Sequence, residues 1–295
     1  MIYAAIDIGS NAGRLLFSNV TEINGVPKAE KASLIRIPLR LGFDVFANGF
    51  ISDEKIEDLI NTLKAFKLLI DVYKPIAYKA CATSAMRDAS NRIEIIKRIK
   101  DEVEIDLEVI DGLEEARYIT ANNDAFLNAH IPYMMFVDVG GGSTEISLLH
   151  HRNLIDSESF NIGTIRLLNK SVSNTEWDRM NYWLQQYKPI YSKLYLVGSG
   201  GNINKIKKLY GSQTDEFVSF ERIKHAYKDL LKISVEQRIT TLNLRPDRAD
   251  VIVPAAEIFL NIHKVLKIDK IFIPRIGLAD GIIYELHHHY GEDPK

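Results

Sequence analysis

The stretch AAIDIGSNAGRLLF, residues 4–17, returns in altered form as MFVDVGGGSTEISL at residues 135–148. Aligned on Asp7 and Asp138, both copies read as an apolar strand, an aspartate, a turn of small residues and a second apolar strand. Each copy is expected to be a β-hairpin whose tight turn uses Gly, Ser and Asn because these residues tolerate positive φ. Successive backbone amides in such a turn bind anions, and a carboxylate beside them can hold a cation. The repeat therefore predicts phosphate chemistry in a cleft between two similar domains.

Composition limits the classes of protein that this chain can belong to. A chain of 295 residues suits two domains, because single hydrophobic cores stop growing at roughly 250–300 residues. A formal net charge of −2 argues against a general nucleic-acid or membrane-surface protein, so neither partner is expected. The N-terminal residues lack a secretory pattern, no apolar run approaches the ~20 residues of a membrane span, and the single Cys81 excludes an internal disulfide. These features predict a cytoplasmic protein.

Hydrophobic periodicity and turn signals predict the same order of elements in both halves. In the first half we expect strands at 2–8, 14–20 and 31–37, a helix capped by Ser52 that runs to about Tyr73, a strand at 76–82, helices from about 84 and 90, a strand at 106–110 and a helix at 113–128. In the second half we expect a hairpin at 135–149, a strand at 154–160, helices at 164–171 and 174–187, a strand at 193–197, helices at 202–209, 219–233 and 248–267, a strand at 270–274 and a helix at 279–290. The predicted domains are residues 1–122 and 123–295, and a return of the last helix to the first domain is left open.

Glycine-rich segments are the main candidates for anion binding. Three consecutive glycines at residues 140–142 weaken a strand pair, which is hard to explain unless a group such as phosphate approaches the backbone closely. The segment GSGGN at residues 198–202 lies between a predicted strand and helix and offers a helix N-terminus to an anion or nucleotide. Lys205, Lys207 and Lys208 follow, and they form either a solvated face or a track for a polyanion.

Three charged residues lie at predicted strand-to-helix junctions. Arg87 follows the strand at 76–82 and suits either a bidentate contact to phosphate or an ordinary surface position. Glu114 and Glu115 fall in the first turn of the helix at 113–128. Acidic side chains there interact favourably with the helix dipole, so a capping role is the alternative to a catalytic one.

Seven motifs follow one another along the chain in a recognisable order. They are DIGSN, ATSAMRDASN, GLEEARY, DVGGGSTE, GSGGNINKI, RADVIVPAAEI and GLADGIIYEL. In this order the chain resembles the exopolyphosphatase/guanosine pentaphosphate phosphohydrolase family over about residues 1–290. The resemblance implies two α/β, ribonuclease-H-like domains of the actin-like ATPase superfamily that flank an interdomain cleft. It also implies a short form that lacks a C-terminal HD-type domain.

The resemblance implies roles for the residues that match the motifs. Glu115 would be the general base that activates water, while Asp7 and Asp138, helped by Glu145, would hold Mg²⁺ or Mn²⁺. The implied phosphate-binding residues are Gly9, Ser10, Asn11, Arg87, Gly140, Gly141, Gly142 and Ser143. The implied contacts to polyphosphate or nucleotide are Gly198, Ser199, Gly200, Gly201, Lys205 and Lys208.

The function that the resemblance implies is exopolyphosphatase activity, with inorganic polyphosphate as substrate and a homodimer as the expected assembly. Hydrolysis of guanosine pentaphosphate, or binding of guanosine tetraphosphate by a non-catalytic sensor, are the alternatives. A sugar kinase of the same superfamily is disfavoured by the EEAR segment. The chain departs from the family pattern at Ala12, Phe43 and Ala279, where a hydroxyl, an acidic and a basic side chain are expected. These departures bear on substrate preference more than on the implied base.

Overall fold

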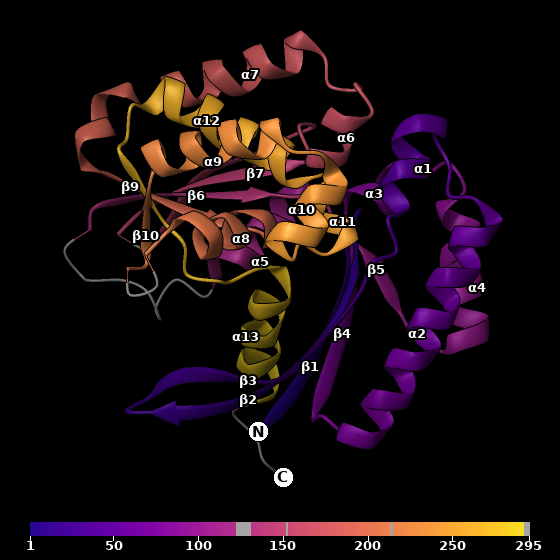
Figure 1. Ribbon diagram of the computed structural model, residues 1–295. Coiled ribbons are helices and arrows are strands. Elements are labelled where there is room, and N and C mark those ends of the chain that lie inside the picture. Colours follow the sequence, from indigo (N-terminus) through magenta and orange to yellow (C-terminus); the bar gives the residue numbers. More distant parts are fainter. Residues whose placement is uncertain (122–130, 152, 213–214, 292–295) are drawn as a thin grey trace. The chain divides into compact units, whose positions relative to one another are not determined.

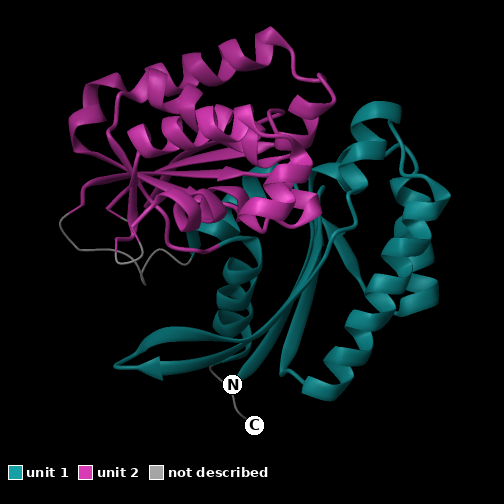
Figure 2. Cartoon of the chain, viewed as in Figure 1, with its two compact units in different colours: residues 1–125, 277–295 teal, residues 126–276 magenta. Residues whose placement is uncertain are grey.

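The computed structural model describes residues 1–121, 131–151, 153–212 and 215–291, and its chain divides into two compact units (Figure 2). The first unit contains residues 1–125 and 277–295, and the second contains residues 126–276. The chain therefore enters the second unit and returns, so that its last helix, α13 (Leu278–Tyr290), belongs to the first unit.

The first unit is a five-stranded sheet with helices on both faces (Figure 1). Its strands are β1 (Ile2–Ile8), β2 (Gly13–Ile23), β3 (Val26–Ile37), β4 (Ala77–Ala82) and β5 (Leu107–Val109). Its other helices are α1 (Leu41–Asn48), α2 (Asp53–Tyr73), α3 (Ser84–Asp88), α4 (Arg92–Val103) and α5 (Gly112–Ala121). The strand order is β3-β2-β1-β4-β5, with β1 antiparallel to β2 and parallel to β4. The predicted helix at 113–128 extends beyond the described residues.

Alternation along β1 divides its side chains between the two faces of this sheet. Ala4, Ile6 and Ile8 join the apolar core that α2 and α4 cover. Tyr3 lies on the opposite face, where its ring meets that of His287 on α13 at 5.8 Å. Asp7 alternates with the core residues, so it projects from the face that carries α13 and the adjoining α5.

The second unit repeats this arrangement. Its strands are β6 (Tyr133–Val139), β7 (Thr144–His150), β8 (Asn153–Phe160), β9 (Leu194–Ser199), β10 (Phe217–Ser219) and β11 (Lys270–Phe272). Its helices are α6 (Thr164–Leu168), α7 (Asn174–Gln185), a 3₁₀ helix (Lys188–Lys193), α8 (Gly201–Tyr210), α9 (Phe220–Lys232), α10 (Val235–Leu242), α11 (Pro246–Ala249) and α12 (Ile252–Leu266). The sheet order β8-β7-β6-β9-β11 repeats β3-β2-β1-β4-β5, and β10 adds one antiparallel edge strand. The two-domain α/β fold predicted from the hairpin repeat is therefore confirmed.

Several elements differ from the sequence-based expectations. Residues 41–48 form α1, residues 217–219 form β10 and residues 235–242 form α10, none of which was expected. The helix expected at 248–267 is two helices, α11 and α12. Ser52 does precede α2, but its hydroxyl bonds the carboxylate of Asp44 at 2.5 Å and does not cap the helix. The side chain had a stronger, charged partner within reach.

Candidate functional site

The loops of the two Asp-x-Gly hairpins, β1–β2 and β6–β7, are built in the same way. The amide of Gly9 donates to the carbonyl of Ala12 at 3.1 Å, and that of Gly140 donates to the carbonyl of Ser143 at 3.0 Å. Each connection thus spans four residues, a length that is usually built around a type I turn with negative φ. None of the residues in either loop has positive φ, so the predicted reason for the small residues is wrong.

Limited space explains Gly140 in the second loop, and Gly163 opposite it, better than backbone conformation does. A Cβ atom on Gly140 would lie 3.2 Å from the carbonyl oxygen of Ser143. Across the loop, a Cβ atom on Gly163 would lie 2.4 Å from the carbonyl oxygen of Gly141. The segment that leads into α6 therefore packs directly on the glycine backbone.

The carbonyl groups of the second loop bond α6. The carbonyl of Gly140 accepts from the amide of Thr164 at 3.0 Å, and that of Gly141 accepts from the amide of Ile165 at 2.8 Å. The side chain of Arg166 donates to the carbonyl of Gly142 at 2.6 Å. Within the described chain, no residue accepts a hydrogen bond from the amides of residues 141–143. The loop is thus held by its carbonyls, which leaves these three amides for an anion.

The first loop is held against the segment before α1. The carbonyl of Ser10 accepts from the amide of Gly42 at 2.8 Å, and that of Asn11 accepts from the amide of Arg40 at 3.1 Å. The hydroxyl groups of Ser10 and Ser84 lie 2.7 Å apart. Phe43 stands where the family pattern has an acidic residue, and the Arg40 guanidinium lies 4.0 Å from the centre of its ring. A cation–π contact therefore orients an arginine beside the first loop.

Equivalent positions of the two hairpins carry different charge pairs. In the first hairpin Asp7 pairs across the strands with Arg14, and the two side chains form an ion pair. In the second hairpin Asp138 pairs with Glu145. Like charges directly opposite each other destabilise a sheet, whereas a divalent cation between two carboxylates removes the repulsion. The second hairpin therefore suits a metal ion, while Arg14 already neutralises Asp7 in the first.

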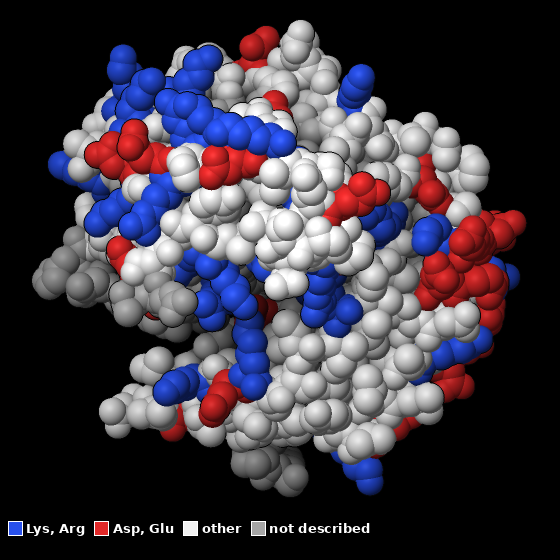
Figure 3. All heavy atoms as spheres, in the orientation of Figure 1, with Lys and Arg blue, Asp and Glu red and all other residues white. Residues whose placement is uncertain are grey.

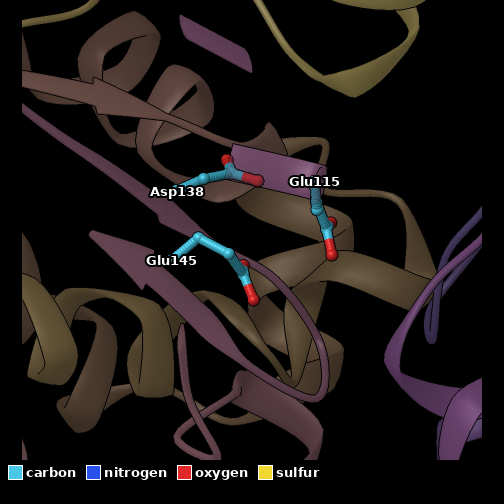
Figure 4. A group of neighbouring side chains, drawn as sticks. All are labelled: Glu115, Asp138 and Glu145. Carbon is cyan, nitrogen blue, oxygen red and sulfur yellow. The ribbon is translucent and has the colours of Figure 1, made fainter. Parts of the chain in front are cut away.

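The acidic pair of the second hairpin is held by neighbouring hydroxyl groups. Asp138 and Glu145 project from β6 and β7, and their carboxylates offer oxygens within 4.8 Å of each other (Figure 4). Ser199 on β9 donates a hydrogen bond to Asp138, and Ser159 on β8 donates to Glu145 at 2.8 Å. Carboxylate oxygens held in this way fit the preference of Mg²⁺ or Mn²⁺ for hard oxygen ligands.

Glu115, drawn in the same figure, comes from the first turn of α5 in the first unit. Asp111 caps this helix, because its side chain accepts from the amide of Glu114 at 2.8 Å and its carbonyl accepts from that of Glu115 at 3.0 Å. Glu115 is only 8% exposed. The capping function thus falls to Asp111, and the charged group of Glu115 is buried.

Arg87 links two elements of the first unit. It lies in the last turn of α3, and its guanidinium donates to the carbonyl of Ile110 at 3.0 Å, one residue before Asp111. This bond ties α3 to the start of α5. The expected contact to phosphate stays a prediction.

The GSGGN segment turns from β9 into α8 beside the acidic pair of the second unit. Gly198 and Ser199 are the last residues of β9, and Gly198 packs against Ile271 of β11. Gly200 has φ of 106°, and a Cβ atom there would lie 3.0 Å from the carbonyl oxygen of Val139. Gly200 is therefore the position in this segment where positive φ and close approach both favour glycine.

A basic groove lies along α8 in the second unit. It has a volume of about 770 Å³, and its charged lining residues are Lys205, Lys207, Lys208, Arg248, Arg275, Asp215 and Glu216. On the face shown in Figure 3, Lys and Arg side chains gather over the region of α8 and α9. We call this feature the α8 groove.

Repulsion among the basic side chains of the α8 groove favours an anion there, although Asp215 and Glu216 in the same lining partly offset it at Lys207. Burial lowers the pKa of Lys205, and the nearby Lys208 and Arg248 lower it further. Burial and the charge of Arg275 likewise lower the pKa of Lys207, whose ammonium donates to the carbonyl of Ile273 at 3.2 Å. An anion in the groove would relieve this repulsion.

Arg248 and Arg275 were given no role in anion binding from the sequence, although Arg248 begins the RADVIVPAAEI motif. Arg248 comes from α11 and packs over Gly201, where a Cβ atom would lie 3.1 Å from its guanidinium. Arg275 follows β11 with φ of 61°. Each lies far along the chain from α8, so only the tertiary fold brings them together. In the sequence, Arg248 and Arg275 stand in two separate segments. Their spacing from the lysines of α8 gives no sign that they share a groove with them.

Two units that repeat one sheet order, each opened by an Asp-bearing hairpin, define a two-domain α/β protein. Residues 33–290 match the Ppx/GppA phosphatase family, and the chain therefore belongs to that family. No helix in the described part of the chain has both the length and the apolar character needed to cross a bilayer.

Solved structures with this fold cover nearly the whole chain. The Ppx/GppA family member from Aquifex aeolicus is 27% identical, with a TM-score of 0.77 over 99% of both chains. An exopolyphosphatase from Cytophaga hutchinsonii is 23% identical, with a TM-score of 0.81 over 98% of both chains, and at that identity it supports the fold alone.

A curated relative from Fusobacterium nucleatum is named a bifunctional 3-dehydroquinate synthase/phosphatase. It is 35% identical over 179 residues, which are 59% of this chain and 27% of the relative. The match thus spans about a quarter of that relative's length.

Proposed function

We propose that this phosphatase-family protein is an exopolyphosphatase that releases terminal orthophosphate from inorganic polyphosphate with the help of Mg²⁺. The observation that carries the proposal is the α8 groove, which presents five basic side chains. Its described lining residues include no aromatic ring on which a nucleobase could stack. A repeating chain of phosphates needs successive cations and no pocket for a nucleobase. The α8 groove has this combination of features.

The acidic pair of the second hairpin is the proposed metal site. Asp138 and Glu145 would hold Mg²⁺ or Mn²⁺, and Asp7 would contribute less than its motif implies because Arg14 already pairs with it. A bound divalent cation supplies positive charge that neutralises the phosphate oxygens. The chain itself keeps the two carboxylates in place through Ser199 and Ser159.

The glycine loops are the proposed phosphate holders. In the second loop the amides of residues 141–143 face no acceptor in the described chain, as set out above. Phosphoryl transfer depends on positioning and charge stabilisation more than on covalent chemistry, so a rigid set of amides is a suitable catalyst. Gly9–Asn11 and Arg87 would serve the same purpose from the first unit.

Glu115 is the proposed general base. It would take a proton from the water that attacks the terminal phosphorus. The water oxygen would bond that phosphorus as the bridging P–O bond breaks, so that orthophosphate and the shortened polyphosphate are the products. A buried carboxylate on the first turn of a well-capped helix has few rotamers, which suits it to accept a proton at a defined place. Catalysis of this kind supplies roughly 10²–10⁴-fold of rate.

Guanosine pentaphosphate is the second candidate substrate, because two features of the α8 groove also suit a guanine nucleotide. Asp215 and Glu216 line the groove and could accept hydrogen bonds from the N–H groups of guanine. The two substrates are separated by measuring kcat/KM for each, alone and in competition. We expect long-chain polyphosphate to have the higher kcat/KM, and a clear preference for guanosine pentaphosphate would reverse the assignment.

Two other outcomes would replace hydrolysis altogether. Tight binding of guanosine tetraphosphate without phosphate release from any substrate would indicate a sensor. Transfer of labelled phosphate to a sugar hydroxyl would indicate a kinase.

A homodimer and a cytoplasmic location are further predictions, to be checked by light scattering of the purified protein and by fractionation of cells.

A further inference from the structure

The helix that carries Glu115 is packed against α13 at a point where only glycine fits. A Cβ atom on Gly281 would lie 1.8 Å from the carbonyl oxygen of Tyr118 and 2.4 Å from its carbonyl carbon. Both atoms are backbone atoms of α5, so a side chain on Gly281 cannot be accommodated by a rotamer change. Because protein interiors are close-packed, α5 and α13 would have to separate by more than about 1 Å to admit even a methyl group.

A second contact fixes α5 along α13, one turn further on. Glu285 accepts a hydrogen bond from the Tyr118 hydroxyl at 3.0 Å and pairs with the Arg117 guanidinium at 3.0 Å. The Lys79 ammonium on β4 lies 3.7 Å from the same carboxylate. Glu285 thus joins α13 to both α5 and the sheet.

The aromatic ring of Tyr118 is held from two sides. The Lys79 ammonium lies 5.3 Å from its centre and the Arg117 guanidinium 4.9 Å. Tyr118 is fully buried, and burial raises the pKa of its hydroxyl to about 12. The hydroxyl therefore stays protonated at neutral pH and can donate to Glu285.

These contacts bear on Glu115 through the geometry of the helix. Glu115 and Tyr118 are three residues apart, so they occupy adjacent turns of one face of α5. A displacement of the Tyr118 backbone therefore displaces Glu115 as well. Misplacing a catalytic group by about 1 Å can reduce the rate about 100-fold.

We infer that Gly281 and Glu285 are positioning residues for Glu115, which they act on by fixing α5 against α13. The inference rests on the proposed function, because it assumes that Glu115 is the base. The motif GLADGIIYEL would then hold α5 in place, and it need not touch the substrate.

The test compares two glycines of the same segment. Gly281→Ala should lower kcat for polyphosphate about 100-fold and leave KM within about twofold, because the glycine loops and the α8 groove that are proposed to bind the substrate lie outside α5 and α13. The matched control is Gly277→Ala, since a Cβ atom on Gly277 meets nothing within 4 Å. This control should keep kcat within about twofold of wild type, with both melting temperatures recorded.

A double-mutant cycle shows whether the effect passes through Glu115. In the Glu115→Gln background, Gly281→Ala should cause no further loss of residual activity, because the group that it misplaces has been removed. A merely structural defect would lower the residual rate in both backgrounds alike, and that result would overturn the inference. A Gly281→Ala variant that folds and retains wild-type kcat would overturn it too.

Glu285→Gln keeps the test decisive if Gly281→Ala does not fold. Glutamine can still accept from Tyr118 but loses its charge attraction to Arg117 and Lys79. We expect about a tenfold loss of kcat that again disappears in the Glu115→Gln background, and an unchanged kcat would overturn the inference.

If Glu115→Gln is itself as active as wild type, the proposed function loses its base and this inference fails with it. If Glu115→Gln is inactive while Gly281→Ala and Glu285→Gln are fully active, only this inference fails.

Discussion

Removing two lysines from the α8 groove should reduce the salt sensitivity of polyphosphate hydrolysis. Lys205 and Lys208 are the suitable pair, because the ammonium of Lys207 is buried and bonds the carbonyl of Ile273. The double variant Lys205→Gln/Lys208→Gln removes two cations while leaving the buried one in place. Since the whole chain carries a net charge of −2, a polyanion must be attracted by local charge and not by the overall field.

The expected size of the effect follows from counterion release. Each contact to a single-stranded polyanion contributes about 0.7 to the slope of log affinity against log salt. Two lost contacts should flatten that slope by about 1.4. Between 50 and 200 mM salt, the increase in KM for long-chain polyphosphate should therefore be about sevenfold smaller in the double variant than in wild type.

The assay is orthophosphate release at several chain concentrations and salt concentrations, with Mg²⁺ held constant. The matched control is Lys224→Gln/Lys228→Gln, which makes the same change in charge on the exposed surface of α9 in the same unit. This control should keep the wild-type slope. An equal slope in all three proteins would show that Lys205 and Lys208 do not bind the polyanion and form an ordinary solvated surface.

Four further changes test other parts of the account. Glu115→Gln should lower kcat by about 10²–10⁴-fold with little change in KM, because glutamine keeps the shape of the side chain and removes the base. If the variant kept more than about a tenth of the wild-type rate, the base would be another residue, and Glu114 is the next candidate. Asp138→Asn should raise the Mg²⁺ concentration needed for half-maximal activity, because a neutral amide is a poorer ligand for a hard cation, and an unchanged Mg²⁺ titration would argue against the metal site. Raising the pH from about 7 to 10 should increase KM, and the increase should begin at a lower pH than it would for a lysine of ordinary pKa, because the pKa of Lys205 is lowered and its charge is lost sooner. Lys205→Arg should move this increase to higher pH. Identical pH profiles for the two proteins would contradict the role of Lys205. Gly200→Ala should lower the free energy of unfolding by about 1–3 kcal/mol in urea denaturation, because φ is 106° and the backbone is crowded; Gly49→Ala, at φ of 83° with open space around it, should cost less.

Every strand except β10, and the longest helix, could be predicted because their signals are local. Apolar runs ending in Asp-x-Gly located both hairpins, and the spacing of apolar residues placed α2 within a residue of its ends. Short helices were missed for different reasons. The eight residues of α1 are too few for a clear period, and the helix begins after Arg40 in a left-handed conformation. In α10 a signal was present, since Ser234 and Gln237 form a capping box.

The site could be predicted only in part, since much of it depends on which strands lie side by side. The motifs pointed to Asp7 and Asp138 as equivalent residues. Their different environments depend on the strand opposite, which supplies Arg14 in one hairpin and Glu145 in the other. Both cross-strand neighbours were visible in the sequence alignment of the repeat. The consequence, that one aspartate is neutralised and the other faces a second carboxylate, needed the register of the sheets.

The residues that hold the site in place were beyond the reach of the sequence alone. Ser199 and Ser159 reach the acidic pair from the strands on either side of the hairpin. Gly281 gives no local sign that a carbonyl group of α5 lies against it. Such contacts arise from packing between elements far apart in the chain, and periodicity carries no information about them.

We expect this chain to hydrolyse inorganic polyphosphate in a metal-dependent reaction. The most direct measurement is the release of orthophosphate from long-chain polyphosphate by the purified protein, with Mg²⁺ and with the metal removed by a chelator. We expect steady release with Mg²⁺, loss of release in the chelator and recovery when Mg²⁺ is restored. The proposed function would be wrong if no orthophosphate were released under any metal condition, or if release were the same with and without the chelator.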